Sequence, residues 1–128
     1  MIRGIGIDMI ETERVADKIS KDSGFREMVF SEREIEYCES KANKYEHYAA
    51  RFAAKEAFFK ALGTGWQNGT AFNEIEILAD EKGKPLLNLI GETAETLADL
   101  RDSLITVSLS HLKTIASAIV IIEHKRRI

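Results

Sequence analysis

The segment over residues 51–65 constrains the fold more than any other part of this chain. Up to Leu62 it consists of good helix formers without a proline or a β-branched residue, and Gly63 follows, where a helix commonly ends. Apolar residues occupy nearly all sides of this helix, which is typical of a helix buried on several sides. We therefore predict a buried central helix over about Tyr45 to Leu62. One side of it is nearly free of side chains, a stripe formed by Ala54, Ala57 and Ala61.

Two charged residues interrupt this apolar helix. Glu56 and Lys60 lie one turn apart, between the alanine stripe and the aromatic residues, where an unpaired charge loses hydration at a cost in free energy. Proteins often keep such charges at functional sites. The alternative is an ordinary Glu–Lys pair on a helix surface, which stabilises a helix by about 0.2–0.5 kcal/mol. The pair by itself favours this second interpretation.

The first strand is predicted over residues 2–9, where apolar side chains alternate with small or polar ones. One side of the strand carries Ile5, Ile7 and Met9, and the other carries Gly4, Gly6 and Asp8. A glycine face indicates close approach by another backbone or by a ligand. The alanine stripe of the central helix is one candidate for this close partner.

Shorter elements are predicted around the central helix. A capping box at Ser31 predicts a helix over 32–40, and Thr12 is the expected N-cap of a helix that ends near Ser20. A further helix is expected at 93–100, and antiparallel strands are expected over 72–79, 86–90, 103–110 and 115–123. Together these elements predict an α+β fold. It is a single domain over residues 1–128, with a largely antiparallel sheet packed against the long central helix.

Length and composition exclude several classes of protein. A chain of 128 residues is long enough to bury roughly two thirds of its unfolded surface without disulfides. Cys38 is the only cysteine, which excludes an internal disulfide and a cysteine-based zinc site. The most apolar stretch, 115–122, is far too short to span a bilayer, and no signal peptide is recognisable. With a net charge of −3, we expect a cytoplasmic protein with no membrane and no nucleic-acid partner.

Four short segments carry residue types that suit phosphate chemistry. They are Asp8 near the end of the first strand, Glu56 and Lys60 on the helix, the loop Gly63-Thr64-Gly65, and His111 at the end of a later strand. Mg²⁺ usually takes one or two protein carboxylates, and water and substrate phosphate supply the rest. Glycines let backbone N–H groups approach an anion, and a lysine neutralises pyrophosphate charge. Each segment alone also has a structural explanation, as a turn, a common loop or a structural histidine.

The same segments resemble the holo-acyl-carrier-protein synthases, which are small bacterial 4′-phosphopantetheinyl transferases. The resemblance covers nearly the whole chain in order, and the central motif is its specific part. It includes Gly4-Ile5-Gly6-Ile7-Asp8, the central helix with Gly63-Thr64-Gly65, Gly83-Lys84-Pro85, Ser108-Leu109-Ser110-His111 and the final strand ending in Glu123. The chain departs from the family pattern at a few positions. Ser110 stands where relatives often have threonine, and Lys18 and Lys21 stand in the first helix where many relatives have other residues or arginine.

The resemblance implies the 4′-phosphopantetheinyl transferase fold and its reaction. That reaction moves 4′-phosphopantetheine from coenzyme A to a serine of apo-acyl carrier protein and releases 3′,5′-ADP, with Mg²⁺ as cofactor. Asp8 and Glu56 are then the metal ligands, and Glu56 and Lys60 the catalytic residues. Coenzyme A would be bound by Lys60, Gly63, Thr64, Gly65, Ser110 and His111. A homotrimer with sites at subunit interfaces also follows from the resemblance alone.

The sequence leaves several alternatives open. The general base is either Glu56, acting through a metal-bound water, or another carboxylate. A non-catalytic module that holds a nucleotide at the same glycine loop would need Lys60 but not two metal carboxylates. A magnesium-dependent phosphohydrolase would form product without any carrier protein. A magnesium requirement for coenzyme A turnover distinguishes the transferase from the nucleotide-binding module. A requirement for carrier protein distinguishes it from the phosphohydrolase.

The first helix predicts a docking surface for the acidic carrier protein that the resemblance implies. Basic residues recur there at helical spacing on one side, and an aromatic residue follows as an apolar contact. This predicted surface consists of Arg14, Lys18, Lys21, Phe25 and Arg26. The alternative is a solvated basic face without a partner.

Overall fold

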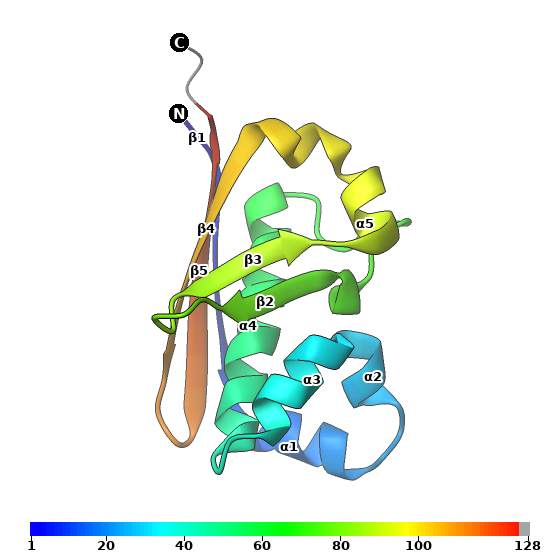
Figure 1. The fold of residues 1–128 in the computed structure, drawn as a ribbon, viewed down its shortest axis with the longest axis vertical. Helices are drawn as coiled ribbons and strands as arrows, with labels where there is room; N and C mark the ends of the chain where they lie inside the picture. The colour runs from blue at the N-terminus through cyan, green and yellow to red at the C-terminus, as the bar shows by residue number, and fades with distance from the viewer. Residues whose placement is uncertain (126–128) are drawn as a thin grey trace.

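The computed structural model describes residues 1–125 and places the central helix, α4 (Lys44–Leu62), in the middle of an α+β fold (Figure 1). The five strands form two antiparallel sheets, whereas the sequence pattern predicted one. The first sheet has the order β1-β5-β4 and consists of β1 (Ile2–Glu11), β5 (Ile115–His124) and β4 (Ser103–His111). The second is a hairpin of β2 (Ile75–Ala79) and β3 (Pro85–Leu89).

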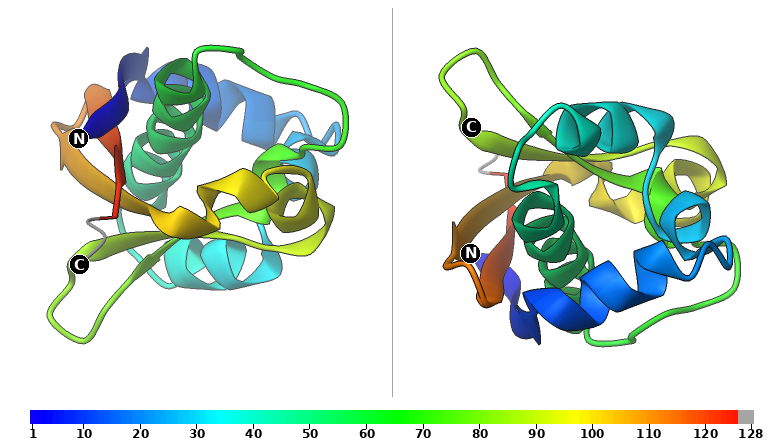
Figure 2. Two further views of the ribbon diagram at one scale, coloured as in Figure 1. Left: turned by 90° about the horizontal axis from the view of Figure 1, so that it is seen from above. Right: turned by 90° about the horizontal axis from the view of Figure 1, so that it is seen from below.

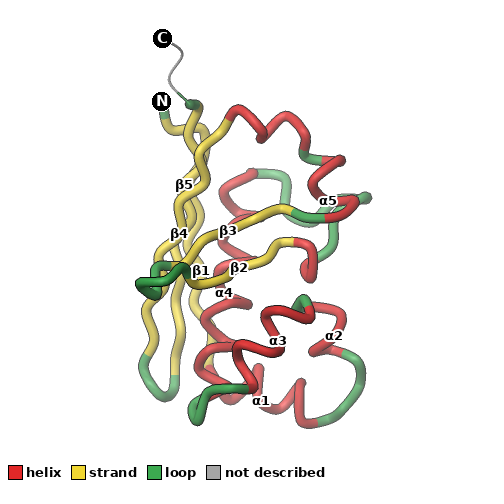
Figure 3. The backbone as a smooth tube through the Cα atoms, viewed as in Figure 1, coloured by secondary structure: helices red, strands yellow, loops and turns green. Residues whose placement is uncertain are grey.

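Shorter helices lie around α4 and beside the hairpin (Figure 3). The views of Figure 2 show α4 enclosed between the three-stranded sheet, the hairpin and the N-terminal helices. Those helices are α1 (Thr12–Ser20), α2 (Phe25–Val29) and α3 (Glu32–Glu39). The other short elements are η1 (Phe72–Glu74), α5 (Gly91–Thr96) and η2 (Ala98–Asp102). Within residues 1–125, no helix combines the length and apolar character needed to cross a bilayer.

The predicted ends of two helices are confirmed. Ser31 forms the capping box at the start of α3, where its side chain accepts from the Glu34 N–H and the Glu34 side chain accepts in return. Gly63 ends α4 in the left-handed region, with φ of 81°. These signals are local, so the sequence alone was sufficient to place both ends.

Three expected boundaries are wrong. Thr12 is not an N-cap but the first residue of α1, and its buried Oγ1 has no hydrogen-bond partner among the described residues. The strand expected from residue 72 begins at Ile75, because Phe72–Glu74 form a 3₁₀ turn first. The helix expected at 93–100 is divided at Leu97 into α5 and η2.

A close backbone contact joins β1 to α4. A Cβ atom built on Gly6 would overlap the carbonyl oxygen of Ala57, and one built on Gly4 would overlap that of Ala61. Only glycine therefore lets the strand lie directly on the helix backbone. The alanine stripe is the partner of the glycine face, as the sequence suggested.

The other face of β1 is left uncovered by this arrangement. Its apolar residues Ile5, Ile7 and Met9 are exposed by 59%, 62% and 63%. The apolar face continues onto β5, where Ile119 pairs with Ile7 and Ile121 with Ile5. The outer side of the three-stranded sheet is thus apolar over two neighbouring strands.

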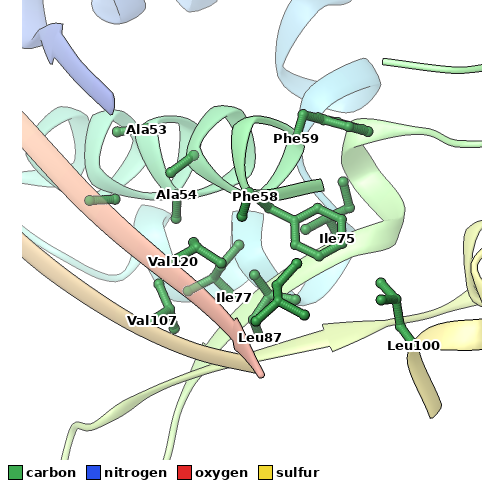
Figure 4. Packing of buried hydrophobic residues seen from close by; sticks show 14 of the residues in the cluster. Ala53, Ala54, Phe58, Phe59, Ile75, Ile77, Leu87, Leu100, Val107 and Val120 are labelled. Carbon is green, nitrogen blue, oxygen red and sulfur yellow. The ribbon is translucent and has the colours of Figure 1, made fainter. Parts of the chain in front are cut away.

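Large apolar side chains fill the space between α4, β5 and the hairpin (Figure 4). Phe58, Ile77 and Val120 are completely buried there, and each such side chain stabilises the fold by roughly 1.5–3 kcal/mol. A second cluster joins the first half of α4 to the N-terminal helices. From Tyr48 to Phe59, every residue of α4 is buried except Glu56.

Two of those buried residues on α4 are charged. Lys55 is completely buried and forms an ion pair of 2.7 Å with Glu34 of α3, which is completely buried as well. Arg51 donates from Nε to the carbonyl of Ile77 at 3.1 Å, and its guanidinium lies 4.2 Å from the ring centroid of Tyr37. Both charges are compensated inside the protein, as buried charges must be.

Gly6→Ala is expected to destabilise the protein, because the added Cβ pushes β1 off the backbone of α4. Overpacking of this kind costs typically about 1–3 kcal/mol and would lower the midpoint of urea denaturation. Ala57→Gly should not rescue the variant, because the clash involves the Ala57 carbonyl oxygen and not its side chain. An unchanged midpoint, or rescue by Ala57→Gly, would contradict the close contact.

Candidate active site

Asp8 and Lys60 meet where β1 passes the last turns of α4. The Lys60 ammonium donates to Asp8 Oδ1 at 2.9 Å and to the Ile7 carbonyl at 3.1 Å. Asp8 follows Gly6 on the same side of the strand, so the close contact of strand and helix brings its carboxylate to α4. Within the described residues, the ion pair that Lys60 forms is with Asp8 and not with Glu56. The ordinary surface pair that the sequence allowed is therefore not what forms.

Glu56 is half-buried beside this ion pair. Burial raises the pKa of its carboxyl, and the nearby Asp8 carboxylate raises it further, while the Lys60 and Lys18 cations oppose both effects. No side chain among residues 1–125 forms a hydrogen bond or an ion pair with this carboxylate. Its ionised form is thus under-compensated and would be stabilised by an added cation.

The expectation that both charges lie enclosed in the apolar surface of α4 is wrong for Lys60. Its side chain is 57% exposed, because it lies in the last turn of the helix, beyond the elements that cover the middle. The exposed ammonium can therefore reach a ligand. Glu56 alone keeps the partly buried position that the sequence indicated.

The two carboxylates fit a magnesium ion as a donor set. Asp8 of β1 lies close enough to Glu56 of α4 to raise its pKa, and a cation shared by the two carboxylates would relieve this repulsion. No cluster of three or more His, Cys, Asp or Glu residues within residues 1–125 could hold a metal ion. Mg²⁺ commonly takes only one or two carboxylates and adds water and substrate phosphate. The site therefore suits a cation that arrives with a phosphate ligand.

The loop Gly63-Thr64-Gly65 follows directly after Lys60. Gly63 and Gly65 have φ of 81° and 65°, and apart from their chain neighbours no described residue lies within 4 Å of a Cβ built on either one. These glycines are thus needed for their backbone conformation, and they leave the loop surface open toward solvent. The Thr64 hydroxyl donates weakly to the Gly65 carbonyl at 3.3 Å.

An apolar pocket opens beside Glu56. Its walls come from α2, α4, η1 and residues 66–71 after the glycine loop, and they include Phe25, Phe52, Trp66 and Phe72. Trp66, the only tryptophan, is 57% exposed, and its indole N–H donates to the Thr70 carbonyl at 3.1 Å. Nothing in the sequence marks Phe52 or Trp66 as a site residue, because both are ordinary apolar residues there.

Ser110 and His111 lie apart from the carboxylates. His111 Nδ1 is 2.9 Å from Glu46 Oε1, and its ring centroid is 5.4 Å from that of His47. Glu46 is in the first turn of α4, about 15 Å along the helix axis from Glu56. Within one chain, the predicted site residues therefore form two groups. Asp8, Glu56 and Lys60 form one group, and Ser110 and His111 form the other.

A second pocket adjoins His111. It is lined by His47, Arg51, Gly83 and Pro85, so it includes part of the Gly-Lys-Pro segment. Burial lowers the pKa of His47, and the charge of Arg51 lowers it further. The buried Arg51 gives this pocket a fixed positive charge, which suits an anionic group. Arg51 was detectable in principle, as a charge within the apolar part of the central helix.

The basic ridge on α1 faces outward as predicted. Val15 is completely buried and Ile19 partly, which leaves Arg14, Lys18 and Lys21 exposed on the other side. The Lys18 ammonium lies 5.4 Å from the ring centroid of Phe25, a cation–π contact. This contact places the ridge next to the apolar pocket that adjoins Glu56.

Arg26 differs from the other basic residues of the predicted docking surface. It pairs with Glu27 at 2.8 Å and with Glu39 at 3.4 Å. The hydrogen bond to Glu27 raises the pKa of Arg26 and lowers that of Glu27. Its charge is therefore largely neutralised within the chain and adds little to the ridge.

Comparison with known proteins assigns this geometry to a family. Residues 4–116 match the 4′-phosphopantetheinyl transferase superfamily. The chain belongs to this superfamily. Its curated relatives and structural neighbours are holo-[acyl-carrier-protein] synthases, and it is an enzyme of that group. The matched region contains Asp8, Glu56, Lys60 and His111.

Three relatives show how far the similarity extends. The holo-[acyl-carrier-protein] synthase of Cytophaga hutchinsonii is 59% identical over 85 residues, which are 66% of this chain and 67% of the relative. That of Ruminiclostridium cellulolyticum is 50% identical over 120 residues, 92% of this chain and 90% of the relative. The crystal structure from Bacillus anthracis, in complex with CoA (3′,5′-ADP), has a TM-score of 0.81 and 35% identity, covering 98% and 99% of the two chains. The predicted family and fold class are confirmed, while the roles of single residues stay predictions.

Proposed function

We propose that this chain transfers 4′-phosphopantetheine from coenzyme A to a serine of apo-acyl carrier protein, with Mg²⁺, and releases 3′,5′-ADP. The observation that carries the proposal is the meeting of Asp8, Glu56 and Lys60 beside an open glycine loop. Two carboxylates and a lysine suit the binding of a pyrophosphate with magnesium. The similarity to a structure solved with coenzyme A supports coenzyme A as the substrate.

Each charged residue has its own part in the proposed transfer. The serine oxygen of the carrier protein bonds to the phosphorus that bears pantetheine, and the bond from that phosphorus to 3′,5′-ADP breaks. Asp8 and Glu56 hold Mg²⁺, which neutralises pyrophosphate charge when bound. The exposed Lys60 ammonium turns to the leaving phosphate and stabilises the charge that develops there. The serine proton passes to a carboxylate, and Glu56 is placed for this role because it lines the apolar pocket on the side of α1.

We also propose that a second copy of the chain completes the site in a cytoplasmic homotrimer. The positive pocket adjoins α4 at Arg51, about 7.5 Å along the helix axis from Glu56, and its His111 pairs with Glu46, about 15 Å away, so one chain presents two half-sites. The uncovered apolar face of β1 and β5 is the surface that subunit contact would bury. In this assembly, the partner subunit's His111 binds the adenosine end of coenzyme A, while Asp8 and Glu56 act on its pyrophosphate.

The carrier protein is proposed to dock on α1. The exposed ridge of Arg14, Lys18 and Lys21 offers positive charge to an acidic partner. Phe25 and the apolar pocket behind it lie between this ridge and Glu56. A serine presented by a partner on α1 would therefore approach the carboxylates directly.

The transfer itself is tested by intact-mass analysis of an apo carrier protein incubated with this chain, coenzyme A and Mg²⁺. We expect the mass of one phosphopantetheine to be added, and chelation by EDTA to stop the reaction.

Asp8→Ala and Glu56→Ala should each lower kcat/KM by more than about 100-fold with little loss of stability, because one carboxylate holds Mg²⁺ poorly. Lys60→Ala should lower the rate of 3′,5′-ADP release strongly and leave the melting temperature nearly unchanged.

Release of 3′,5′-ADP without carrier protein would indicate a phosphohydrolase in place of the proposed transferase.

The divided site is tested by mixing two inactive variants. Asp8→Ala subunits keep the His111 half-site, and His111→Ala subunits keep the carboxylate half-site. Reassembly of equal amounts should restore about a quarter of the wild-type activity, because random mixing pairs intact halves at about that share of interfaces. Absence of recovery in mixed trimers, confirmed by mass spectrometry, would show that each chain contains a complete site.

Arg14→Glu should raise the KM for carrier protein about tenfold and leave the KM for coenzyme A unchanged, because Arg14 lies on the exposed side of α1. Raised salt should also increase the KM of the wild type for carrier protein, because salt screens the attraction between the charges. Arg101→Glu is the matched control, since it makes the same charge change on an exposed residue of η2. Equal effects of both substitutions on the KM for carrier protein would show that α1 is not part of the docking surface.

A further inference from the structure

We propose that Lys55, through its buried ion pair with Glu34, is a positioning residue that holds Glu56 at its place opposite Asp8. The inference rests on the proposed magnesium site and deepens it. Lys55 is completely buried and its ammonium is engaged by Glu34, Phe72 and Ile75, so its effect on the site is transmitted through the position of α4.

The contacts of Lys55 and Glu34 tie α4 to three other segments. The Lys55 ammonium donates to Glu34 Oε1 at 2.7 Å, to the Phe72 carbonyl at 2.8 Å and to the Ile75 carbonyl. An ammonium has three donors, so all of them are used. Glu34 also accepts from the Ile77 N–H at 3.0 Å and from the N-cap N–H of α3 at 3.0 Å. The pair therefore joins α4 to the start of α3 and to the segment where η1 becomes β2.

Such a pair contributes geometry more than stability. The cost of removing two charges from water offsets much of their attraction, so a buried ion pair is weak evidence of stabilisation. Leaving either partner unpaired inside the protein is strongly unfavourable, however. Because Lys55 and Glu34 are both completely buried, only a narrow range of α4 positions satisfies both groups at once.

On the opposite side, α4 meets β1 through a close backbone contact and, in its last turn, through the contacts of the exposed Lys60 with Asp8 and the Ile7 carbonyl. There Ala57 and Ala61 meet Gly6 and Gly4, and their backbones touch without interlocking side chains. Ridges that pack into grooves normally fix a helix against its neighbour, and this contact has none. On the far side, the buried contacts of Lys55 oppose rotation or sliding of α4 against β1.

Glu56 follows Lys55 directly and projects about 100° further around the helix. Any movement of α4 that strains the Lys55 contacts also moves the Glu56 carboxylate relative to Asp8. A misplacement of about 1 Å can cost about 100-fold in rate at a catalytic site. Residues that orient metal ligands typically change metal affinity by about 10- to 100-fold when they are removed.

The test compares Lys55→Met, Glu34→Gln and the double variant with the wild type. Mn²⁺ binding in the presence of coenzyme A, without carrier protein, is followed by the electron paramagnetic resonance signal of free Mn²⁺. We expect all three variants to bind Mn²⁺ at least about tenfold more weakly, with kcat lowered and the KM for carrier protein unchanged. The double variant carries neither charge, so its melting temperature should return toward that of the wild type while Mn²⁺ affinity stays low.

Leu100→Ala is the control for lost stability alone. Leu100 is buried in η2, and its truncation lowers the melting temperature through a cavity without touching α3 or the carboxylates. This variant should bind Mn²⁺ as the wild type does. Wild-type Mn²⁺ affinity in the folded double variant would overturn the positioning role, and if Lys55→Met does not fold, Glu34→Gln and the double variant decide. Failure of the wild type itself to bind Mn²⁺ would refute the proposed magnesium site instead.

Discussion

The backbone contact between β1 and α4 is the constraint on which the rest of the structure depends. Because Gly4 and Gly6 have no side chains, the strand lies on the helix itself, and Asp8 on the same strand face comes within 2.9 Å of Lys60. The same contact turns the apolar residues of β1 outward, where they form an uncovered face. One steric condition, the absence of two Cβ atoms, thus determines both the carboxylate arrangement and the surface that we propose is buried between subunits.

Charges on α4 fall into two groups that serve different purposes. Lys55 is completely buried and uses its donors on partners from α3, η1 and β2, so it defines where the helix lies. Arg51 is buried too and donates from Nε to the Ile77 carbonyl, while its guanidinium also lines the pocket beside His111. Glu56 and Lys60 remain accessible, and the Glu56 carboxylate is left without a compensating partner among residues 1–125. A site that must bind a metal and a pyrophosphate needs such incompletely satisfied groups, because fully paired charges have nothing left to offer a ligand. The rigid pairs beside them limit how far the site can deform.

The division of the predicted site into two half-sites gives a physical reason for assembly. A pocket with the buried Arg51 and the Glu46–His111 pair lies along the N-terminal half of α4, whereas Glu56 and Lys60 lie in its C-terminal half. A long substrate with charge at both ends can bridge two such half-sites when they face each other across an interface. The apolar outer face of the sheet supplies a driving force for bringing two copies together. Substrate binding and assembly would then use the same surface.

The sequence by itself determined the features that depend on near neighbours: the central helix with its glycine end, the capping box of α3, the glycine face of β1 and the carboxylate–lysine motif. Each follows from the spacing of residues that are close in sequence, or from a hydrogen bond between such residues, so it does not depend on the rest of the chain. Tertiary structure alone decided that Lys55 is buried and Lys60 exposed, that five strands form two sheets, and that His111 lies far from Glu56. Desolvation and pairing depend on segments that are distant in sequence, and no local pattern specifies which distant segment will cover a given side chain.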